Sequence, residues 1–286
     1  MSEFRKLTDA EIASLERAAN TAADWSEVEV TADFSPAQCR ASRFEGRVRI
    51  GRGARVYDST VRNYLLGDES LVERVTALEC RRRSAFGNGT EVAAMNECAG
   101  RTVRIYDALT AQTAYLLAVY RHRPQTIAAL ERMIGAYVLE RTSELGSVGR
   151  GARVTGARFV REVRIGDGAV IDGATLLENG TLCAGAFVGA DVKARDFILA
   201  EGARVDNGSI LERCFVGESS VLDKGFTATH SLFFANCHCE CGEAASVFAG
   251  PYTVSHHKST LLIAGMFSFF NAGSLSLIHI SEPTRH

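Results

Sequence analysis

A recurrence of branched and aromatic residues at a step close to six dominates the stretch from Gly146 to Phe226. The step runs through these positions: Val148, Val154, Phe159, Ile165, Val170, Leu176, Leu182, Phe187, Val192, Ile198, Val205, Ile210, Phe215 and Val221. A period of six fits neither the 3.6-residue turn of an α-helix nor the two-residue alternation of a long strand. It fits a short strand, a tight turn and one inward side chain per face, with about eighteen residues in a three-faced coil. The sequence therefore predicts a left-handed parallel β-helix of hexapeptide repeats.

A β-sandwich is the alternative, because strands spaced every eight to twelve residues also give short apolar runs separated by glycine. A sandwich does not hold a near-six step over a dozen successive positions, however. We therefore expect Val148, Ile165 and Phe187 to lie on parallel strands and not on antiparallel hairpins.

Changes of period divide the chain into segments, and the predicted fold class is mainly β, with an inserted helical hairpin and a short N-terminal helix. The predicted segments are an N-terminal helix and lead-in cap (1–42), a first β-helix segment (43–106), the inserted helical hairpin (107–146), a main β-helix segment with a histidine-rich end (147–274) and a tail (275–286). The tail resembles the translation of a sequencing adapter. It is therefore expected to be non-native and is excluded from fold reasoning.

The helices are predicted from capping residues and apolar spacing. Thr8 and Glu11 form a capping box at the start of the N-terminal helix, which is expected to run to about Asn20. In the hairpin, apolar residues at helical spacing predict one helix capped by Asp107 and a second that starts at Pro124 and stops at Gly146.

Charge and hydropathy restrict the partners and the compartment. The net charge of −2 creates no global field that would attract nucleic acid or an anionic membrane. The N-terminus lacks an apolar leader and no run of eighteen apolar residues occurs, so we expect a cytoplasmic protein. The eight cysteines are then expected to be thiols.

Three motifs resemble a bacterial family of unknown function, the domain of unknown function numbered 4954. They are Tyr120–Pro124, Ser231–Phe234 and, above all, Phe248–Phe269, and the likeness runs from Arg5 to Ser274. Family members are longer than this chain. The resemblance implies a hexapeptide-repeat β-helix, but it supplies no reaction and no catalytic residue. More distantly, the repeats look like those of acyltransferases and nucleotide-sugar enzymes that use trimeric β-helices.

Histidines near the C-terminal end are the candidate catalytic residues. Acyl transfer to a sugar hydroxyl needs a base near neutral pH, and imidazole suits that task. His256 and His257 are adjacent, so on an extended strand they point to opposite faces, and Ser255 would share a face with His257. His230 is the second candidate. The alternative is that one histidine bonds a backbone carbonyl while the other is solvated.

Cations and polar side chains supply the candidate binding residues. Lys258 would hold a phosphate of coenzyme A or of a nucleotide, in a groove shared with Asn236. Arg121 and Arg123 join the two predicted helices, where they either bind a substrate anion or only complement the helix dipole. The run Arg81–Arg83 is either an anion site or an exposed charged turn.

No metal site is predicted. The run Cys237–Cys241 alternates Cys with His238 and Glu240, which invites a zinc interpretation. Residues four apart on a straight strand lie about 13 Å apart, however, which is too far for one zinc ion. The alternation instead predicts that the three thiols of Cys237, Cys239 and Cys241 point inward and that His238 and Glu240 point outward.

The predicted function is a transferase that moves an acyl group onto a sugar or a nucleotide-sugar. It would have no tightly bound cofactor, with acyl-coenzyme A as the donor, and it would act as a homo-trimer with ligand sites between subunits. A non-catalytic β-helix scaffold or a carbohydrate-binding protein is the alternative. The position of His257 discriminates between them, because a groove lined by Lys258 and Asn236 favours an enzyme and burial favours a scaffold.

Overall fold

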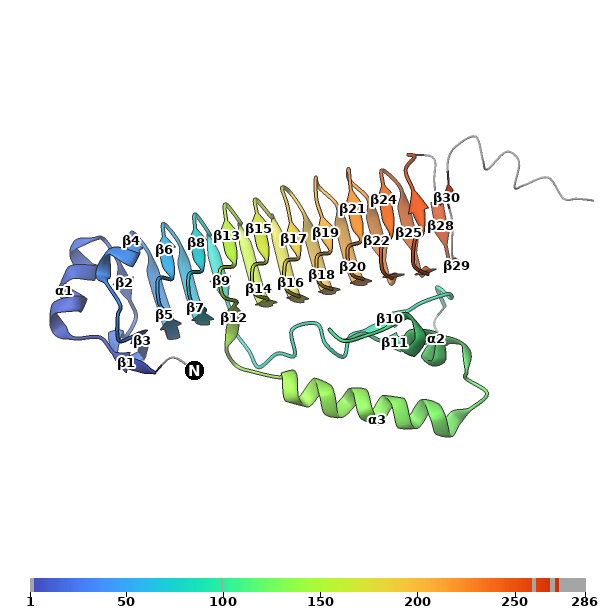
Figure 1. Cartoon of the computed structure of the whole chain (residues 1–286), viewed down its shortest axis with the longest axis horizontal. Coiled ribbons are helices and arrows are strands. Elements are labelled where there is room, and N and C mark those ends of the chain that lie inside the picture. Colours follow the sequence, from blue (N-terminus) through green and yellow to red (C-terminus); the bar gives the residue numbers. More distant parts are fainter. Residues whose placement is uncertain (1–2, 99, 259–260, 268–270, 273–286) are drawn as a thin grey trace, which may run out of the picture.

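A computed structural model describes residues 3–98, 100–258, 261–267 and 271–272 of the chain. The predicted tail at 275–286 lies outside these residues. The described part is mainly β, with parallel strands stacked along one long axis and helices at its start and along its side (Figure 1). The prediction of a mainly β chain interrupted by a helix pair is confirmed. None of the described helices is both long enough and apolar enough to cross a membrane.

Most described strands belong to two long sheets. The larger sheet contains β1 (Phe4–Lys6), β2 (Thr21–Ala22), β3 (Val28–Thr31), β5 (Arg43–Ile50), β7 (Thr60–Leu66), β9 (Ala77–Glu79), β12 (Gly146–Val148), β14 (Phe159–Ile165), β16 (Leu176–Leu182), β18 (Lys193–Leu199), β20 (Ile210–Val216), β22 (Thr227–Thr229), β23 (Leu232–Phe233), β25 (Glu243–Ala245), β26 (Phe248–Ala249), β28 (Leu261–Ile263) and β29 (Met266–Phe267). The smaller contains β4 (Cys39–Arg40), β6 (Arg55–Tyr57), β8 (Leu71–Glu73), β13 (Arg153–Thr155), β15 (Val170–Asp172), β17 (Phe187–Val188), β19 (Arg204–Val205), β21 (Val221–Asp223), β24 (His238–Glu240), β27 (Val254–Ser255) and β30 (Asn271–Ala272).

Strand register shows a repeat of 17 residues in the middle of the stack. Val154 lies opposite Ile171, and Ile171 lies opposite Val188. Each repeat, here called a rung, is thus one residue shorter than the eighteen expected. Val148 lies opposite Ile165 on parallel strands, and Phe187 lies opposite Val170 on another parallel pair, as predicted.

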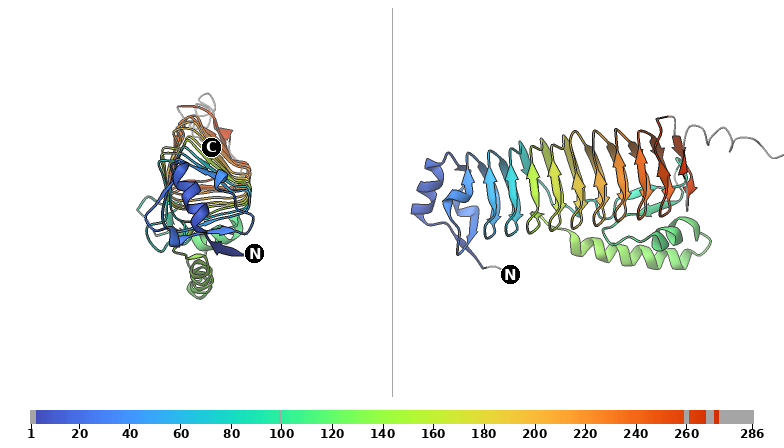
Figure 2. Two further views of the ribbon diagram at one scale, coloured as in Figure 1. Left: turned by 90° about the vertical axis from the view of Figure 1, so that its left-hand side faces the viewer. Right: turned by 45° about the horizontal axis from the view of Figure 1, so that its top comes forward.

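Three columns of residues with positive φ mark three corners in the rungs. The first contains Gly46, Asn63, Glu162, Asn179, Asp196, Arg213, His230, Ser246 and Ala264; the second, Gly53, Glu69, Gly151, Gly168, Gly185, Gly202, Ser219, Asn236 and Tyr252; the third, Ala41, Asp58, Arg74, Gly156, Gly173, Asp191, Asn207, Lys224 and Cys241. A tight turn between short strands requires a left-handed residue, and Gly, Asn and Asp adopt that conformation at least cost. Viewed along the stack, the rungs superimpose (Figure 2).

The core lies inside the rungs. Inward positions repeat from rung to rung and are filled by branched residues that are at most 1% exposed: Val154, Ile171, Val188, Val205 and Leu222. Full burial of one such side chain contributes roughly 1.5–3 kcal/mol. Burial of inward side chains on every rung therefore contributes a large part of the stability of the stack.

The stack begins earlier in the chain than predicted. β2 and β3 already pair in parallel with β5, and Val28 lies opposite Val48. The segment predicted as a lead-in cap at 1–42 thus contains the strands of the first rung, because Val28 and Val30 are inward core residues. β1 pairs antiparallel with β3, and α1 (Asp9–Arg17) is linked to β1 through the pair of Arg5 and Glu11.

The predicted capping box of α1 is confirmed. The Thr8 hydroxyl accepts a hydrogen bond from the backbone N–H of Glu11, and the Glu11 carboxylate accepts one from the backbone N–H of Thr8. The helix ends at Arg17 and not near Asn20. Two short 3₁₀ turns, η1 (Trp25–Glu27) and η2 (Pro36–Gln38), connect the first strands.

A long insertion leaves the stack at one corner. Val61 lies opposite Leu78, whereas Tyr64 lies opposite Gly146, so β9 and β12 are two halves of one rung strand. The chain leaves the stack after Glu79, whereas the insertion was predicted to begin at residue 107. Residues 81–106, which were assigned to the first β-helix segment, therefore belong to the insertion. A bridge between Ser84 and Ser143 closes its root.

The insertion contains a small antiparallel pair, β10 (Glu91–Ala93) and β11 (Thr102–Arg104), and two helices, α2 (Ala111–Val119) and α3 (Pro124–Arg141). Thr110 and not Asp107 caps α2, because its hydroxyl accepts the N–H of Thr113 at 3.2 Å. Asp107 instead accepts the hydroxyl of Tyr137. Both helices lie along the C-terminal half of the stack (Figure 1).

Candidate functional site

One outward column of the stack changes from polar to apolar along the chain. In register on successive rungs it contains Arg164, Thr181, Ile198, Phe215, Leu232, Phe248 and Met266. The residues from Ile198 to Phe248 in this column are at most 4% exposed, whereas Met266 is 45% exposed. The apolar part, here called the apolar column, coincides with the face that the insertion covers.

Burial holds the insertion on this face. Leu117 of α2 and Ile134 of α3 are completely buried in one cluster with Ile198, Phe215 and Leu232. Leu109 and Tyr106 complete the contact on the insertion side. Because apolar area removed from water contributes roughly 25 cal/mol per Å², this contact fixes α2 against the stack.

Hydrogen bonds pin the insertion along the first corner. The Asn179 side chain accepts the N–H of Gly87 at 3.0 Å, and the Thr181 hydroxyl donates to the carbonyl of Phe86 at 2.6 Å. Further along, the carbonyl of Ser246 accepts the N–H of Met95 at 2.6 Å. These contacts hold residues 86–95 of the insertion against the stack.

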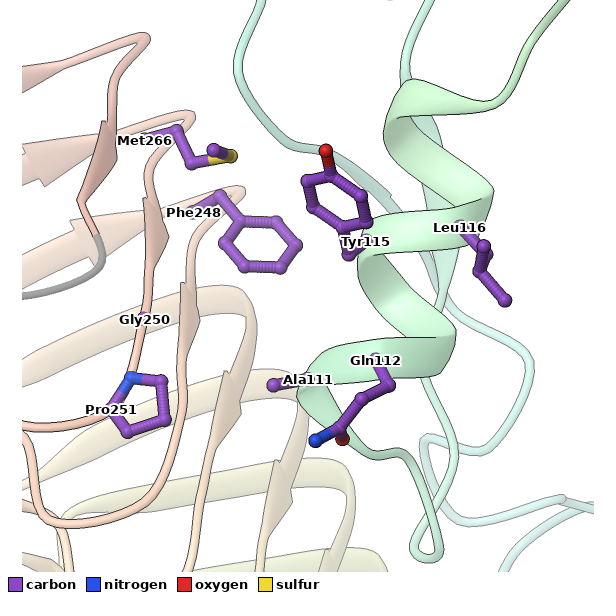
Figure 3. Close-up of a pocket in the computed structure, with 8 residues that line it drawn as sticks. All are labelled: Ala111, Gln112, Tyr115, Leu116, Phe248, Gly250, Pro251 and Met266. Atoms are coloured by element: carbon purple, nitrogen blue, oxygen red, sulfur yellow. The ribbon is translucent and has the colours of Figure 1, made fainter.

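A cleft of about 490 Å³ opens between α2 and these rungs. It is lined by Ala111, Gln112, Tyr115, Leu116, Phe248, Gly250, Pro251 and Met266. Figure 3 shows the ring of Tyr115 on the side of Phe248 and Met266, and Ala111 and Gln112 on the side of Pro251. The cleft lies where coverage of the apolar column ends, and its walls are mostly apolar.

A second chamber of about 270 Å³ continues the cleft. It shares Ala111, Gln112 and Pro251 with the first, and it adds Leu109, Thr110, Glu218, Phe234 and Ala235. The exposed carboxylate of Glu218 and the amide of Gln112 make this end polar. Together the two chambers, here called the α2 groove, offer space for an apolar chain at one end and acceptors for hydroxyl groups at the other.

His256, His257 and Lys258 lie elsewhere. All three are exposed and follow the end of β27 at Ser255. The ring of His256 packs edge-on against His238, with centroids 4.7 Å apart. The expectation that Ser255 shares a face with His257 is wrong, because Ser255 is completely buried inside the stack, whereas His257 is exposed beyond the end of β27.

His230 is a first-corner residue with φ of +47°. Its Nδ1 accepts the backbone N–H of Ala93 at 3.0 Å. The pKa of His230 is lowered, chiefly by burial and further by the Arg213 guanidinium, with Glu212 opposing. The lowered pKa favours the neutral ring, whose unprotonated Nδ1 can accept this hydrogen bond. The His230 side chain thus connects the insertion to the stack.

The other predicted binding residues occupy separate places. Asn236 is exposed at the second corner, next to Ala235 of the α2 groove. Arg121 and Arg123 are exposed in the α2–α3 turn, where Arg121 donates to the carbonyl of Thr102. The predicted site residues are therefore distributed over the corners and the turn, and the contacts of the described chain do not join them into one groove.

Cys237 and Cys239 point inward, as the alternation predicts, and burial raises the pKa of both thiols. The prediction is wrong for Cys241, which is partly exposed at the third corner, where the strand alternation has ended. On the outside, Glu240 contacts His238 at 3.0 Å. Within the described ranges, no three His, Cys, Asp or Glu side chains converge as a metal site.

Sequence reasoning missed the α2 groove. Tyr115 and Gln112 come from the insertion, whereas Glu218 comes from a rung corner, and no local motif connects them. A usable signal was present: Ile198, Phe215 and Leu232 recur at a step of 17 in outward positions. Outward apolar residues at the rung period indicate a face that another part of the chain covers.

Comparisons with known proteins identify relatives without an assigned activity. The chain matches the model of a domain of unknown function (DUF4954) over residues 4–58 and 54–279. An uncharacterized protein of Treponema pallidum (strain Nichols) is 24% identical over 308 aligned residues, which cover 92% of this chain and 42% of the relative. The chain therefore spans less than half the length of that relative.

Proposed function

The chain belongs to the DUF4954 family, and we propose that its stacked sheets form a left-handed parallel β-helix that carries an acyltransferase site. The near-six step and the three corner columns support the β-helix. In this proposal the protein transfers an acyl group from acyl-coenzyme A to a sugar or nucleotide-sugar, in the cytoplasm and as a homo-trimer.

The shape and polarity of the α2 groove carry the proposal. An acyl chain fits the apolar end beside Phe248 and Met266, and a sugar hydroxyl reaches Glu218 and Gln112 at the polar end. In the reaction, the hydroxyl oxygen bonds to the acyl carbon, the carbon–sulfur bond breaks, and the hydroxyl proton passes to a base while the thiolate of coenzyme A leaves. Glu218 accepts the hydrogen bond that orients this hydroxyl.

Filling the groove tests this proposal. Thermal unfolding is measured with and without acyl-coenzyme A for the wild type, for Ala111→Trp and for the control Ala129→Trp on the exposed side of α3. A ligand at 100 times its Kd stabilises the folded state by about 2.7 kcal/mol, so the wild type and the control gain melting temperature. Equal stabilisation of Ala111→Trp would exclude the groove as the donor site.

The proposed role of His257 as the general base is tested in a separate experiment. His257 and Lys258 can serve the groove only if the proposed trimer carries them to it from a neighbouring subunit. In that arrangement His257→Ala slows transfer by about 10²- to 10⁴-fold, and Lys258→Ala weakens donor binding at unchanged turnover. Wild-type turnover of His257→Ala, or a monomer by light scattering, removes His257 from the mechanism.

A non-catalytic scaffold or carbohydrate-binding protein is the second candidate. The separation of His230, which is bonded to the insertion at the first corner, from the adjacent and exposed His256 and His257 favours it. Under this alternative, sugars bind and raise the melting temperature, but no acyl-coenzyme A is consumed in their presence. Release of free coenzyme A thiol, followed with a thiol reagent, decides between the two functions.

A further inference from the structure

A polar pocket of about 230 Å³ lies at the root of the insertion. It is lined by Arg47, Asn63, Cys80, Arg81, Arg82, Arg83 and Glu144. Four of these residues are arginines, and the space that they line, here called the arginine pocket (Arg47 and Arg81–Arg83), lies where the chain leaves the stack at Cys80 and returns after Glu144. They come from segments that are far apart in the sequence.

The backbone around the arginine pocket is fixed by one amide side chain. Asn63 accepts the N–H of Arg47 at 3.0 Å and donates to the carbonyl of Cys80 at 2.8 Å. Gly46, with φ of +58°, precedes Arg47, and any Cβ at this position would overlap the Asn63 amide. On the other side, Glu162 accepts the N–H of Arg81 at 3.0 Å. The attachment points of Arg47 and Arg81 are thus held before any ligand binds.

Positive charge exceeds negative charge in the pocket. Arg81 pairs with Glu79 at 2.8 Å, but Glu79 also pairs with Arg161. Arg47 reaches Glu144 only at 3.7 Å, and the Glu144 side chain is 70% exposed. For Arg82 and Arg83, the described part of the chain provides no carboxylate within ion-pair distance.

We propose that the arginine pocket binds a phosphate-class anion and that the bound anion stabilises the root of the insertion. The planar guanidinium fork matches the geometry of phosphate oxygens and forms charge-assisted, bidentate hydrogen bonds. An anion here offsets the repulsion among Arg47, Arg82 and Arg83. Because Cys80 and Glu144 line the same space, the anion also connects the two ends of the insertion. This inference is independent of the acyl-transfer proposal.

Titration calorimetry of the 286-residue chain with pyrophosphate tests the site. The test variant is Arg82→Gln/Arg83→Gln, and the matched control is Arg55→Gln/Arg153→Gln, which removes the same charge from exposed positions on β6 and β13. We expect the wild type and the control to share one Kd, and the test variant to bind at least about tenfold more weakly, since charge-assisted hydrogen bonds are lost. Equal affinity of the test variant and the wild type would overturn the proposal.

The anion could be the phosphate of a nucleotide or a phosphate group alone. A second titration, with adenosine diphosphate and with adenosine, distinguishes these two sources. Tighter binding of adenosine diphosphate than of pyrophosphate identifies a nucleotide phosphate, and equal binding identifies the phosphate group alone. Adenosine binding as tightly as its diphosphate contradicts an anion site. The Ala111→Trp variant should retain pyrophosphate binding, so failure here is distinguishable from failure of the acyl-transfer proposal.

Hydrogen exchange tests the second half of the proposal. The backbone amides of Ser84 and Ser143 exchange hydrogen bonds at the root. With pyrophosphate bound, both amides should exchange more slowly in the wild type and the control, but not in Arg82→Gln/Arg83→Gln. Binding without slower exchange would show that the anion does not stabilise the root.

Discussion

Large and small residues alternate on inward positions of neighbouring rungs. Tyr64 lies opposite Gly146, and its hydroxyl donates past that glycine to the carbonyl of Val163 at 2.7 Å. Phe197 lies opposite Gly180 in the same way. A Cβ at either glycine would overlap the ring on the neighbouring rung. These two glycines are therefore required by close packing, because the aromatic rings need the space.

Gly180→Ala is expected to destabilise the chain by about 1–3 kcal/mol, the usual cost of overpacking a buried site. Phe197 is completely buried, so its ring has no room to move away. The measurement is urea unfolding in the wild type and in Phe197→Leu, where the smaller side chain should reduce the cost of Gly180→Ala. Equal costs in both backgrounds would show that the ring is not the cause.

The Glu11 carboxylate couples α1 to pH. The Arg5 hydrogen bond, supported by Thr8, lowers the pKa of Glu11 to about 2 from an ordinary value of 4.5, while burial opposes the shift. A lowered pKa in the folded state stabilises the fold above the unfolded pKa, and this contribution is lost as the pH falls through about 2.

Glu11→Gln should therefore cost about 1–2 kcal/mol at pH 7, allowing for solvent screening of the partly exposed pair. The deficit relative to the wild type should shrink between pH 4.5 and 2. Denaturant unfolding of both proteins across this pH range measures the difference in their free energy of unfolding. A deficit that stays constant down to pH 2 would assign the effect to something other than carboxylate charge.

Among the strands, glutamate and arginine alternate along one outward column from β5 to β20. In register this charge ladder contains Glu45, Arg62, Glu79, Arg161, Glu178, Arg195 and Glu212. Because neighbouring strands lie about 4.8 Å apart, each charge between the two ends of the ladder has an opposite charge above and below it. The ladder continues across the insertion, where Arg161 meets Glu79 at 2.8 Å. A slip by one rung would place like charges together, so the ladder favours the observed register.

Arg161→Glu should destabilise the chain more than Arg161→Gln, by roughly 1 kcal/mol, because it places like charges opposite each other on neighbouring strands. Urea unfolding at low ionic strength measures the difference. In 1 M salt, where the screening length is about 3 Å, the difference should shrink. If the two variants are equally stable at low salt, the ladder does not contribute to register.

For the whole molecule, the chain leaves the stack for the insertion and returns from it at one and the same corner. The rung strand formed by β9 and β12 needs one corner residue between Glu79 and Gly146, as Asn63 supplies between Arg62 and Tyr64. The insertion therefore occupies one turn of the stack and leaves the pairing on both sides unchanged.

Deleting residues 81–145 together with Cys80→Asn should leave a folded stack. It uncovers the apolar column, so the variant should bind a hydrophobic dye and self-associate. The measurements are far-ultraviolet circular dichroism, dye fluorescence and light scattering. A control carries the same deletion with Ile198, Phe215, Leu232 and Phe248 changed to Thr, and it should be monomeric or trimeric without dye binding. Loss of strand signal in both variants would show that the stack cannot fold without the insertion.

Sequence alone predicted the parallel pairing and the capping box of α1, but only part of the predicted six-step points inward: Ile198 and Phe215 belong to the outward apolar column, and Ile210 is 44% exposed. Each rung pairs only with its neighbours. The spacing of inward residues along the sequence therefore reflects the local structure of each rung. Val148, Val154 and Ile165 are members of the predicted six-step that are buried in the core for this reason. The same holds for the inward Cys237 and Cys239, which follow strand alternation.

Only the tertiary structure decided where the insertion begins, how Ser255 points and where a groove forms. The break after Glu79 separates two halves of one strand, and each half alone is too short to show a period. Ser255 points inward because β27 places it in register with the inward Cys239 of β24, and a corner can accept many residue types. The α2 groove joins Tyr115 to Phe248, which are far apart in the chain. Contacts of this kind depend on which rungs the insertion covers. The local periodicity of the sequence carries no information about which rungs these are.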